Sequence, residues 1–353
     1  MARHRLIALL VILLVFFGLI MVASASVVDA ARDFGDKWYY LKLQSVWAAL
    51  GLVVFFLVSR WPHQRLAKYA RPLFWLTTVL LLAVLIPGIG TKLLGARRWI
   101  NLGFFNLQPA ELAKFSICVY LAALLKKTSS FAAFLFPVAV FSGLVFLEPD
   151  LGTAMVVSIG SLITYFVITG KITQMALAAP VALLLLLAVI FLSPYRASRF
   201  QDFLNSSHDT QGSSYQIRQA LLALGSGGIT GVGLGQSREK YEFLPEVTTD
   251  SIFAVIGEEL GLIGAVVLLV VFFLLISTGL QVAARAPAPF SANLALAVTS
   301  LLAVQAFLNI SAIIALLPLT GIPLPFISYG GSSLVIVLLS MGILVNIARS
   351  DRL

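Results

Sequence analysis

The chain has 353 residues, of which 60% are hydrophobic and 11% are charged, and its formal net charge is +9. Soluble domains carry about 25% charged residues, so this composition excludes a soluble enzyme and indicates a membrane protein with many spans. The positive charge is typical of cytoplasmic loops in such proteins, and we prefer that explanation to nucleic-acid binding. The single cysteine, Cys118, excludes an intrachain disulfide, and its apolar surroundings predict a small core residue.

The N-terminus resembles a secretory signal, because Arg3 and Arg5 precede an apolar run that ends in Ala-Ser-Ala. That run extends from Leu6 to about Ala23, whereas the apolar part of a signal peptide has about 7–15 residues. We therefore interpret it as an uncleaved first span.

Apolar runs long enough to cross about 30 Å of hydrocarbon predict an all-α polytopic membrane protein with about ten helices. We treat residues 1–353 as one membrane domain, with a large extracytoplasmic loop over 194–250, between helices 7 and 8. The expected helices are 6–28, 42–59, 72–87, 107–125, 131–147, 151–169, 174–193, 251–278, 291–317 and 331–348.

The distribution of Lys and Arg predicts the orientation. With ten spans, the side that holds both termini has twelve Lys and Arg, against six in the short loops of the other side. The long loop is not counted, because long segments contribute little to orientation. Both termini are therefore expected in the cytoplasm, and 88–106, 148–150, 194–250 and 318–333 on the outer face. A site there has no access to nucleotide sugars, so its substrate must be exported or carried on a lipid.

The long outer loop contains an amphipathic stretch and a glycine-rich run. Residues 214–224 place apolar side chains at helical spacing, which predicts a helix that lies on the membrane surface and stops at Gly225. Six glycines follow within residues 225–235. They are not a Walker-type phosphate loop, since neither a preceding strand nor a following Lys-Ser/Thr is present. Such a run predicts a tight loop whose backbone closely approaches a ligand or another segment.

Residues 108–114, Gln-Pro-Ala-Glu-Leu-Ala-Lys, begin a helix in which Pro109 suits the first turn and Glu111 lies one turn before Lys114. Two interpretations stand. The two charges form a structural ion pair, or Lys114 offers positive charge to an anionic substrate. The nearby Arg97-Arg98-Trp99 favours the second interpretation, because an arginine beside an interfacial tryptophan lies at headgroup depth.

Two further clusters lie at span ends. Glu148-Pro149-Asp150 forms a turn, and we interpret Asp150 primarily as the N-cap of the following helix. Arg196 and Arg199 are one turn apart just beyond a span. They either snorkel to the interface or bind a phosphate, and the sequence does not separate these alternatives.

Asp250 precedes the helix over 251–278, which also carries Glu258 and Glu259. Asp250 is either a cap matched to the helix dipole or a functional carboxylate. Glu259 lies on the opposite face of the helix from Asp250, so at least one of the two glutamates is expected to pair with another helix.

No metal site is legible, since His4, His63 and His208 are scattered, and no Ser-His-Asp set falls on one side of the membrane. A divalent cation such as Mg²⁺ or Mn²⁺ is compatible with the chemistry, but the sequence offers no dedicated ligand set. What remains at the outer face is acidic groups with arginines and a lysine. This set suits general-base catalysis on a lipid that bears a pyrophosphate.

The motifs together resemble the SEDS family (shape, elongation, division and sporulation), which includes FtsW and RodA. The resemblance covers nearly the whole chain, and Gly235-Gln236-Ser237 followed by Lys240 is closer to the FtsW branch. The matching segments are Gly95 to Trp99, Gln108 to Lys114, Glu148 to Ala154, Arg196-x-x-Arg199, Gly225 to Gly228, Phe253 to Gly261 and Pro325 to Ser333.

This resemblance implies a ten-span, inverting peptidoglycan glycosyltransferase that polymerises lipid II beside a class B penicillin-binding protein, a single-span transpeptidase. It implies that Asp250 is the catalytic residue. The family's His-Thr-Asp-Phe-Ile-Phe motif reads Thr248-Thr249-Asp250-Ser251-Ile252-Phe253 here, so the first histidine and the first phenylalanine are replaced. The expected substrate-binding residues are Arg98, Glu111, Lys114, Arg196, Arg199, Lys240, Glu258, Ser328 and Tyr329.

The hypothesis is that the chain joins disaccharide units at the outer face of the bacterial cytoplasmic membrane, in division or elongation, and releases undecaprenyl pyrophosphate. Two alternatives stand. A lipid II flippase would carry broken helices that meet at the midplane, usually with an internal repeat, and we find no repeat. The other alternative is a different lipid-linked sugar polymerase, such as an O-antigen polymerase. Expected partners are lipid II, the transpeptidase and membrane lipids, and nucleic acid is not expected.

Overall fold

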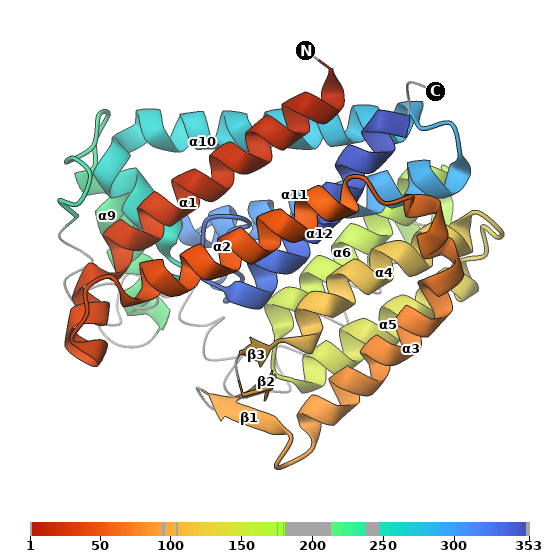
Figure 1. Cartoon of the computed structure of the whole chain (residues 1–353), viewed down its shortest axis with the longest axis horizontal. Helices are drawn as coiled ribbons and strands as arrows, with labels where there is room; N and C mark the ends of the chain where they lie inside the picture. Colours follow the sequence, from red (N-terminus) through yellow and green to blue (C-terminus); the bar gives the residue numbers. More distant parts are fainter. Residues whose placement is uncertain are drawn as a thin grey trace.

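The computed structural model describes residues 2–93, 96–103, 105–174, 176–178, 180, 213–237 and 247–350, and all structural statements below concern these residues. They form a helical bundle with one small sheet (Figure 1). The helices are α1 (Arg3–Phe34), α2 (Tyr39–Val58), η1 (His63–Arg65), α3 (Leu66–Leu85), α4 (Pro109–Leu125), α5 (Phe131–Leu147), α6 (Leu151–Thr169), α9 (Ser213–Ser226), α10 (Ile252–Arg285), α11 (Pro289–Ile313) and α12 (Gly331–Ser350).

The structure confirms the helical polytopic fold class. Within the described residues, seven helices are long and apolar enough to cross a membrane, counting η1 and α3 as one. The helices α4 and α5 have 17 residues each, near the lower limit of about 17 for a span, and lie in the same bundle. Nine of the ten expected helices thus have a counterpart. The expected span over 174–193 lies largely outside the described residues, so the total of ten stays a prediction.

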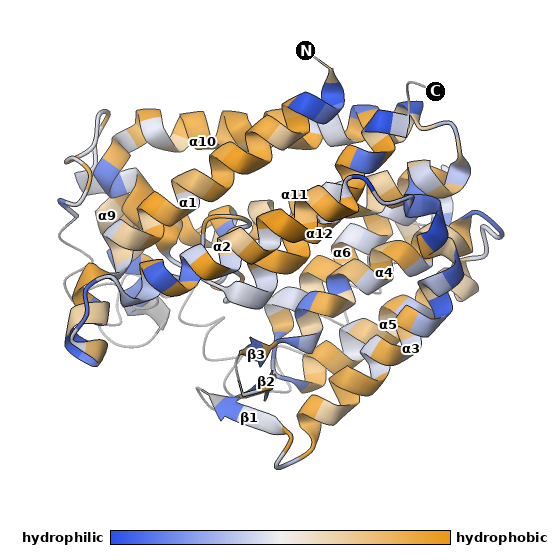
Figure 2. Ribbon diagram, viewed as in Figure 1, coloured by the Kyte–Doolittle hydropathy of each residue, from blue (hydrophilic) through white to orange (hydrophobic). Residues whose placement is uncertain are grey.

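The apolar surface follows the pattern of a protein in lipid. Large exposed hydrophobic side chains, such as Phe16, Trp75 and Phe273, lie on the outward sides of the helices, and polar residues gather at the helix ends (Figure 2). In contrast, α11 is the central helix, with 83% of its apolar window buried. Polar side chains on α11 are therefore held inside the protein, where they need hydrogen-bond partners.

The segment 88–106 contains an antiparallel sheet that we did not expect. Its strands are β1 (Gly90–Leu93), β2 (Ala96–Asn101) and β3 (Asn106–Leu107), in the order β1-β2-β3. Pairing in this sheet satisfies backbone groups that a polar loop would leave to water. The strands are too short for an alternating pattern to stand out in the sequence, and the sheet holds Arg98 on β2.

Both termini lie at the same end of the bundle (Figure 1). At this end Arg3 Nε donates to Gln281 Oε1 at 3.4 Å, and Arg349 Nη1 donates to the Ser59 carbonyl at 3.4 Å. His63 makes ring-nitrogen hydrogen bonds with Asn346 Oδ1 at 2.5 Å and Ser291 Oγ at 2.7 Å, which joins α12 and α11 to the loop before α3. The basic loops of the sequence thus meet at one end.

Candidate active site

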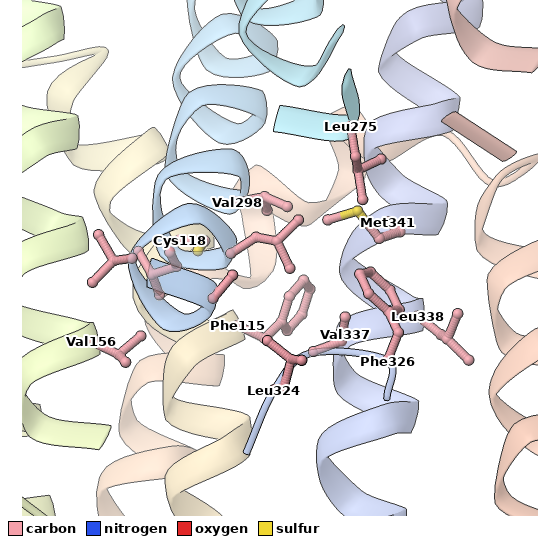
Figure 3. Packing of buried hydrophobic residues seen from close by; sticks show 14 of the residues in the cluster. Phe115, Cys118, Val156, Leu275, Val298, Leu324, Phe326, Val337, Leu338 and Met341 are labelled. Carbon is pink, nitrogen blue, oxygen red and sulfur yellow. The ribbon is translucent and has the colours of Figure 1, made fainter. Parts of the chain in front are cut away.

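Residues 314–330, the re-entrant loop between α11 and α12, fold back into the bundle. The carbonyl of Phe326 lies against Gly18, in the middle of α1. Leu324 and Phe326 are buried and point into the space between Phe115 of α4 and Val337 of α12 (Figure 3). We had expected 318–333 at the outer surface. Its apolar side chains instead draw the loop inward, which is tolerated at this depth only where protein groups satisfy the backbone.

Amide side chains of two helices satisfy this loop. On α11, Asn309 Nδ2 donates to the Ile322 carbonyl at 2.7 Å and Gln305 Nε2 donates to the Pro323 carbonyl at 2.9 Å. On α2, Gln44 accepts from the Gly330 amide at 3.2 Å and donates to the Ser328 carbonyl at 3.3 Å. The re-entrant loop is therefore a fixed part of the core.

Asp250 lies on a turn, residues 247–251, which the re-entrant loop and α11 hold by three successive carbonyls. The Thr248 carbonyl accepts from the Tyr329 amide at 2.8 Å, and the Thr249 carbonyl accepts from Ser328 Oγ at 2.5 Å. The carbonyl of Asp250 itself accepts from Asn309 Nδ2 at 2.9 Å. Because three neighbouring peptide units are anchored, the Cα of Asp250 has little freedom to move.

The carboxylate of Asp250 is partly buried and lies over Gly321, an exposed residue of the re-entrant loop. A methyl group on Gly321 would stand 3.4 Å from Asp250 Oδ2. The N-cap position of α10 belongs to Ser251, so Asp250 precedes the helix by one more residue than a cap. A carboxylate in this place can receive a proton from a hydroxyl that reaches the outer end of the bundle.

Lys114 lies at the other end of a polar connection that starts at Asp250. Asn309 and Gln305 are one turn apart on α11, and Lys114 Nζ donates to Gln305 Oε1 at 2.8 Å. The same ammonium forms an ion pair with Glu111 Oε2 at 2.8 Å, and both side chains are at most 7% exposed. The expected pair of Glu111 and Lys114 is therefore present. An ammonium has three donors, so one N–H remains beyond these two contacts.

The glycine run closes a break in α10. At Gly261 the backbone leaves helical geometry, with φ 66° and ψ −167°, a region that essentially only glycine occupies. The carbonyls of Glu258 and Glu259, freed by this break, accept from the amides of Val232 and Gly233, both at 3.0 Å. A Cβ on Gly227 would approach the Gly257 carbonyl closer than real Cβ contacts do. The close approach predicted for the glycine run is thus made to another segment of the chain.

Glu258 and Glu259 are both buried and contact different partners. Ser24 Oγ on α1 donates to the Glu259 carboxylate at 2.6 Å, which confirms that one glutamate pairs with another helix. Ser237 Oγ, at the end of the glycine run, donates to Glu258 Oε2 at 2.5 Å. Both carboxylates thus fix the broken start of α10, the segment that follows Asp250.

Arg98 holds the turn between α5 and α6. Its Nε donates to the Glu148 carbonyl at 3.2 Å and its Nη2 donates to the Pro149 carbonyl. Asp150 Oδ1 accepts from the Thr153 amide at 3.0 Å, which confirms Asp150 as the N-cap of α6. The Glu148 side chain is fully buried. Burial, together with the charge of Asp150, raises the pKa of Glu148 to about 9, and Arg98 only partly opposes that shift.

The remaining expected site residues fall into two groups. Ser328 is buried, and its hydroxyl is engaged twice, because it also accepts from the Leu324 amide at 2.8 Å. The ring of Tyr329 packs edge-on against Tyr40, and burial raises the pKa of its phenol to about 12, so it stays a neutral donor. Arg196, Arg199 and Lys240 lie outside the described residues. Among the described residues, no three His, Cys, Asp or Glu gather as they would around a metal ion.

Comparison with known proteins gives the family. The sequence profile described as "Cell cycle protein", of the FtsW, RodA and SpoVE group, matches residues 4–353. The chain belongs to this family. It is 38% identical to a probable peptidoglycan glycosyltransferase FtsW of Trichlorobacter lovleyi, over 100% of this chain and 95% of that protein. It is 37% identical to stage V sporulation protein E of Bacillus subtilis, over 98% of this chain and 97% of that protein. The family resemblance read from the motifs is confirmed.

Solved structures agree with this FtsW/RodA/SpoVE assignment. A chain from a structure titled "Structural coordination of polymerization and crosslinking by a peptidoglycan synthase complex" superposes with a TM-score of 0.81 at 28% identity. The rod shape determining protein RodA of Thermus thermophilus superposes with a TM-score of 0.71, also at 28% identity. Each match covers 98% of this chain and 97% of the other.

Sequence reasoning missed three residues that position the site of this family member. Gln44, Gln305 and Asn309 are amides inside apolar helices, and each bonds the re-entrant loop. A signal was present, because uncharged polar side chains in a span often face other protein segments. The spacing of Gln305 and Asn309, four residues apart, places both on one face of α11.

Proposed function

We propose that this chain is a peptidoglycan glycosyltransferase that polymerises lipid II and uses Asp250 as its general base. The observation that carries the proposal is the anchoring of the Asp250 turn by three successive carbonyl hydrogen bonds, which preorganises one carboxylate at the outer end of the bundle. The relatives at 37–40% identity support the reaction class, since several bear the name of a probable peptidoglycan glycosyltransferase FtsW.

In the proposed reaction, the 4-hydroxyl of one glycan attacks the anomeric carbon of a second lipid-linked glycan. The new C–O bond forms as the bond to the pyrophosphate oxygen breaks, with inversion at that carbon. The hydroxyl proton passes to the Asp250 carboxylate. A sugar hydroxyl is a poor nucleophile, so a base held within hydrogen-bond reach is required, and such a base typically contributes about 10²–10⁴ in rate.

The leaving undecaprenyl pyrophosphate gains negative charge, and fixed cations stabilise that charge in the transition state. Lys114 is suited to this role because Glu111 and Gln305 fix its ammonium and leave one N–H for a phosphate oxygen. Arg98 contributes positive charge at the same end of the bundle. We assign Arg196, Arg199 and Lys240 to the same phosphate contacts, on the motif alone. Glu258 and Ser328 act as positioning residues, and Tyr329 donates its phenol hydrogen to substrate.

The proposed orientation places the Asp250 end outside and both termini in the cytoplasm of a bacterial cell, in the cytoplasmic membrane. The asymmetry in basic residues supports this, because Lys and Arg concentrate on the cytoplasmic side. Described members of the basic set meet at the end that holds the termini. In this orientation the donor reaches Asp250 on its lipid from the outer leaflet.

We also propose a partner, a single-span class B penicillin-binding protein. One structural neighbour comes from a peptidoglycan synthase complex that, by its title, coordinates polymerisation and crosslinking. A chain that covers 98% of ours at a TM-score of 0.81 supports assembly of the same kind here. The glycan that Asp250 helps to build then passes directly to the transpeptidase.

Purified protein in detergent micelles with defined lipid II separates this proposal from the flippase alternative. A micelle has no two leaflets, so transport cannot produce a signal there, whereas polymerisation gives glycan strands that a gel resolves. We expect strands, and we expect their yield to rise when the cognate transpeptidase is added. Absence of strands both with and without the partner would refute the proposed function.

A further inference from the structure

A cavity lies at the end of the bundle opposite to Asp250, between α3, the end of α4 and the start of α11. Its volume is about 370 Å³, within the range of about 300–1,000 Å³ typical of ligand sites. Lys126 and Lys127 line it and follow Lys114 by 12 and 13 residues, so about 18–20 Å of α4 separates the cavity from the polar connection to Asp250. It belongs to a different site.

Four cations surround the cavity, which also has an apolar floor. Lys68 and Arg71 come from α3, Lys126 and Lys127 follow α4, and all four side chains are exposed. The floor includes Phe290 and the ring of Tyr120. The site therefore combines positive charge at its rim with an apolar interior, which suits an anionic amphiphile rather than a polar metabolite.

No acidic side chain balances these cations in the part of the chain that the structure describes. The described ion pairs involve none of the four. Every described carboxylate belongs to the opposite ends of the helices, in 29–36, 111, 148–150 and 250–259. A cluster of uncompensated charges on the membrane boundary attracts anionic lipid, by about 5-fold in affinity for each Lys or Arg near the surface.

The surroundings of the cavity are lipid-facing. Tyr69, between two lining residues, is 55% exposed, and Trp75, one turn after Arg71, is 57% exposed. Exposed Tyr and Trp beside basic residues mark the headgroup level of a bilayer. Beyond them, Leu76 and Val79 continue an apolar exposed face along α3, on which acyl chains can lie.

We propose that this cavity binds an anionic glycerophospholipid. The phosphate lies among Lys68, Arg71, Lys126 and Lys127, with the Arg71 guanidinium able to bind it through two N–H groups. The upper part of the lipid enters over Tyr120 and Phe290, and its chains follow the exposed face of α3. The bound lipid would hold α3, α4 and α11 together at the cytoplasmic end of the bundle.

Native mass spectrometry of the full-length, delipidated protein tests this proposal. Phosphatidylglycerol, zwitterionic phosphatidylcholine and inorganic phosphate are each titrated into wild type and into Lys126→Gln/Lys127→Gln. The matched control is Arg60→Gln/Arg65→Gln, which removes two exposed charges from the preceding loop without touching the cavity. We expect wild type and control to bind phosphatidylglycerol alike, and the Lys126/Lys127 variant to bind it about 30-fold more weakly, at about 5-fold per charge.

Two results would overturn the proposal. Unchanged phosphatidylglycerol affinity in the Lys126/Lys127 variant, or equal affinity of wild type for phosphatidylcholine, would show that the cavity does not select the anionic headgroup. Displacement of phosphatidylglycerol by inorganic phosphate at equal concentration would show a site for a free anion and not for a lipid. Retention of the lipid against phosphate, together with the loss in the variant, supports the site.

Discussion

Gly227 offers a sharp test of how the glycine run supports Asp250. A Cβ at this position would stand 2.8 Å from the Glu258 Cα, and it would lie closer still to the Gly257 carbonyl. Ordinary contact begins near 3.4 Å, so the start of α10 must move by about 0.6 Å in Gly227→Ala. Overpacking of this kind costs about 1–3 kcal/mol in the free energy of unfolding.

The displacement also predicts a loss of activity. Gly227 packs against the segment 252–260, which directly follows Asp250, so a shift at Glu258 moves the base as well. A misplacement of about 1 Å can cost about 100-fold in rate, and we therefore expect Gly227→Ala to polymerise lipid II about 10- to 100-fold more slowly. The assay is glycan-strand formation on a gel, beside thermal unfolding in the same detergent.

Two matched variants separate the causes. A Cβ on Gly225 meets nothing within 4 Å, so Gly225→Ala keeps full activity and gains about 0.5–1 kcal/mol in helix α9. Gly235 has φ +78° with open space around it, so Gly235→Ala reports only the strain of positive φ, about 1–2 kcal/mol. If Gly227→Ala and Gly225→Ala polymerise at equal rates, the glycine run does not support the position of Asp250.

Three further outcomes are expected. Lys114→Ala leaves Glu111 buried and unpaired, so it should lose about 3–5 kcal/mol of stability by thermal unfolding; Glu111→Gln/Lys114→Met should recover much of that stability and still fail to polymerise, whereas an active double variant would make the pair purely structural. Because the folded state holds the pKa of Glu148 near 9, above its ordinary value of 4.5, the folded protein binds the extra proton between these values; stability should fall as pH rises from about 4.5 to about 9, and an unchanged slope in Glu148→Gln would refute this assignment. In sealed cells, Leu234→Cys should react with an impermeant thiol reagent and Gln64→Cys should not, with native Cys118 silent because it is buried, and the reverse pattern would invert the orientation.

Long apolar runs were sufficient to place nine helices, because each span must bury or expose hydrocarbon over a fixed thickness. The break at Gly261 was not predictable from periodicity, since apolar residues continue on both sides of it. Its cause is an interaction with the glycine run, which lies some 30 residues earlier in the chain. Close contact between the two segments depends on tertiary packing, and local patterns in the sequence do not encode the partner.

The candidate site was predictable in its charged residues and not in its frame. Asp250, Lys114 and Arg98 are recognisable because charge is costly in a membrane protein and needs a use or a partner. The anchoring of Asp250 depends on main-chain carbonyls and on Ser328 and Asn309, whose roles follow only from the inward fold of the re-entrant loop. That loop reads as an ordinary outer connection, because its apolar residues are too few for a span.

The polymerisation rate of Asp250→Asn, with the cognate transpeptidase saturating and lipid II defined, tests the central claim most directly. This substitution keeps the shape and the hydrogen-bonding capacity of the side chain and removes its basicity. Asp33→Asn, at an exposed carboxylate at the end of α1, is the matched control. We predict that Asp250→Asn falls by about 10²–10⁴, with the level of folded protein, partner binding and lipid II binding unchanged, while Asp33→Asn matches wild type. A near wild-type rate in Asp250→Asn would contradict the assignment of Asp250 as the base.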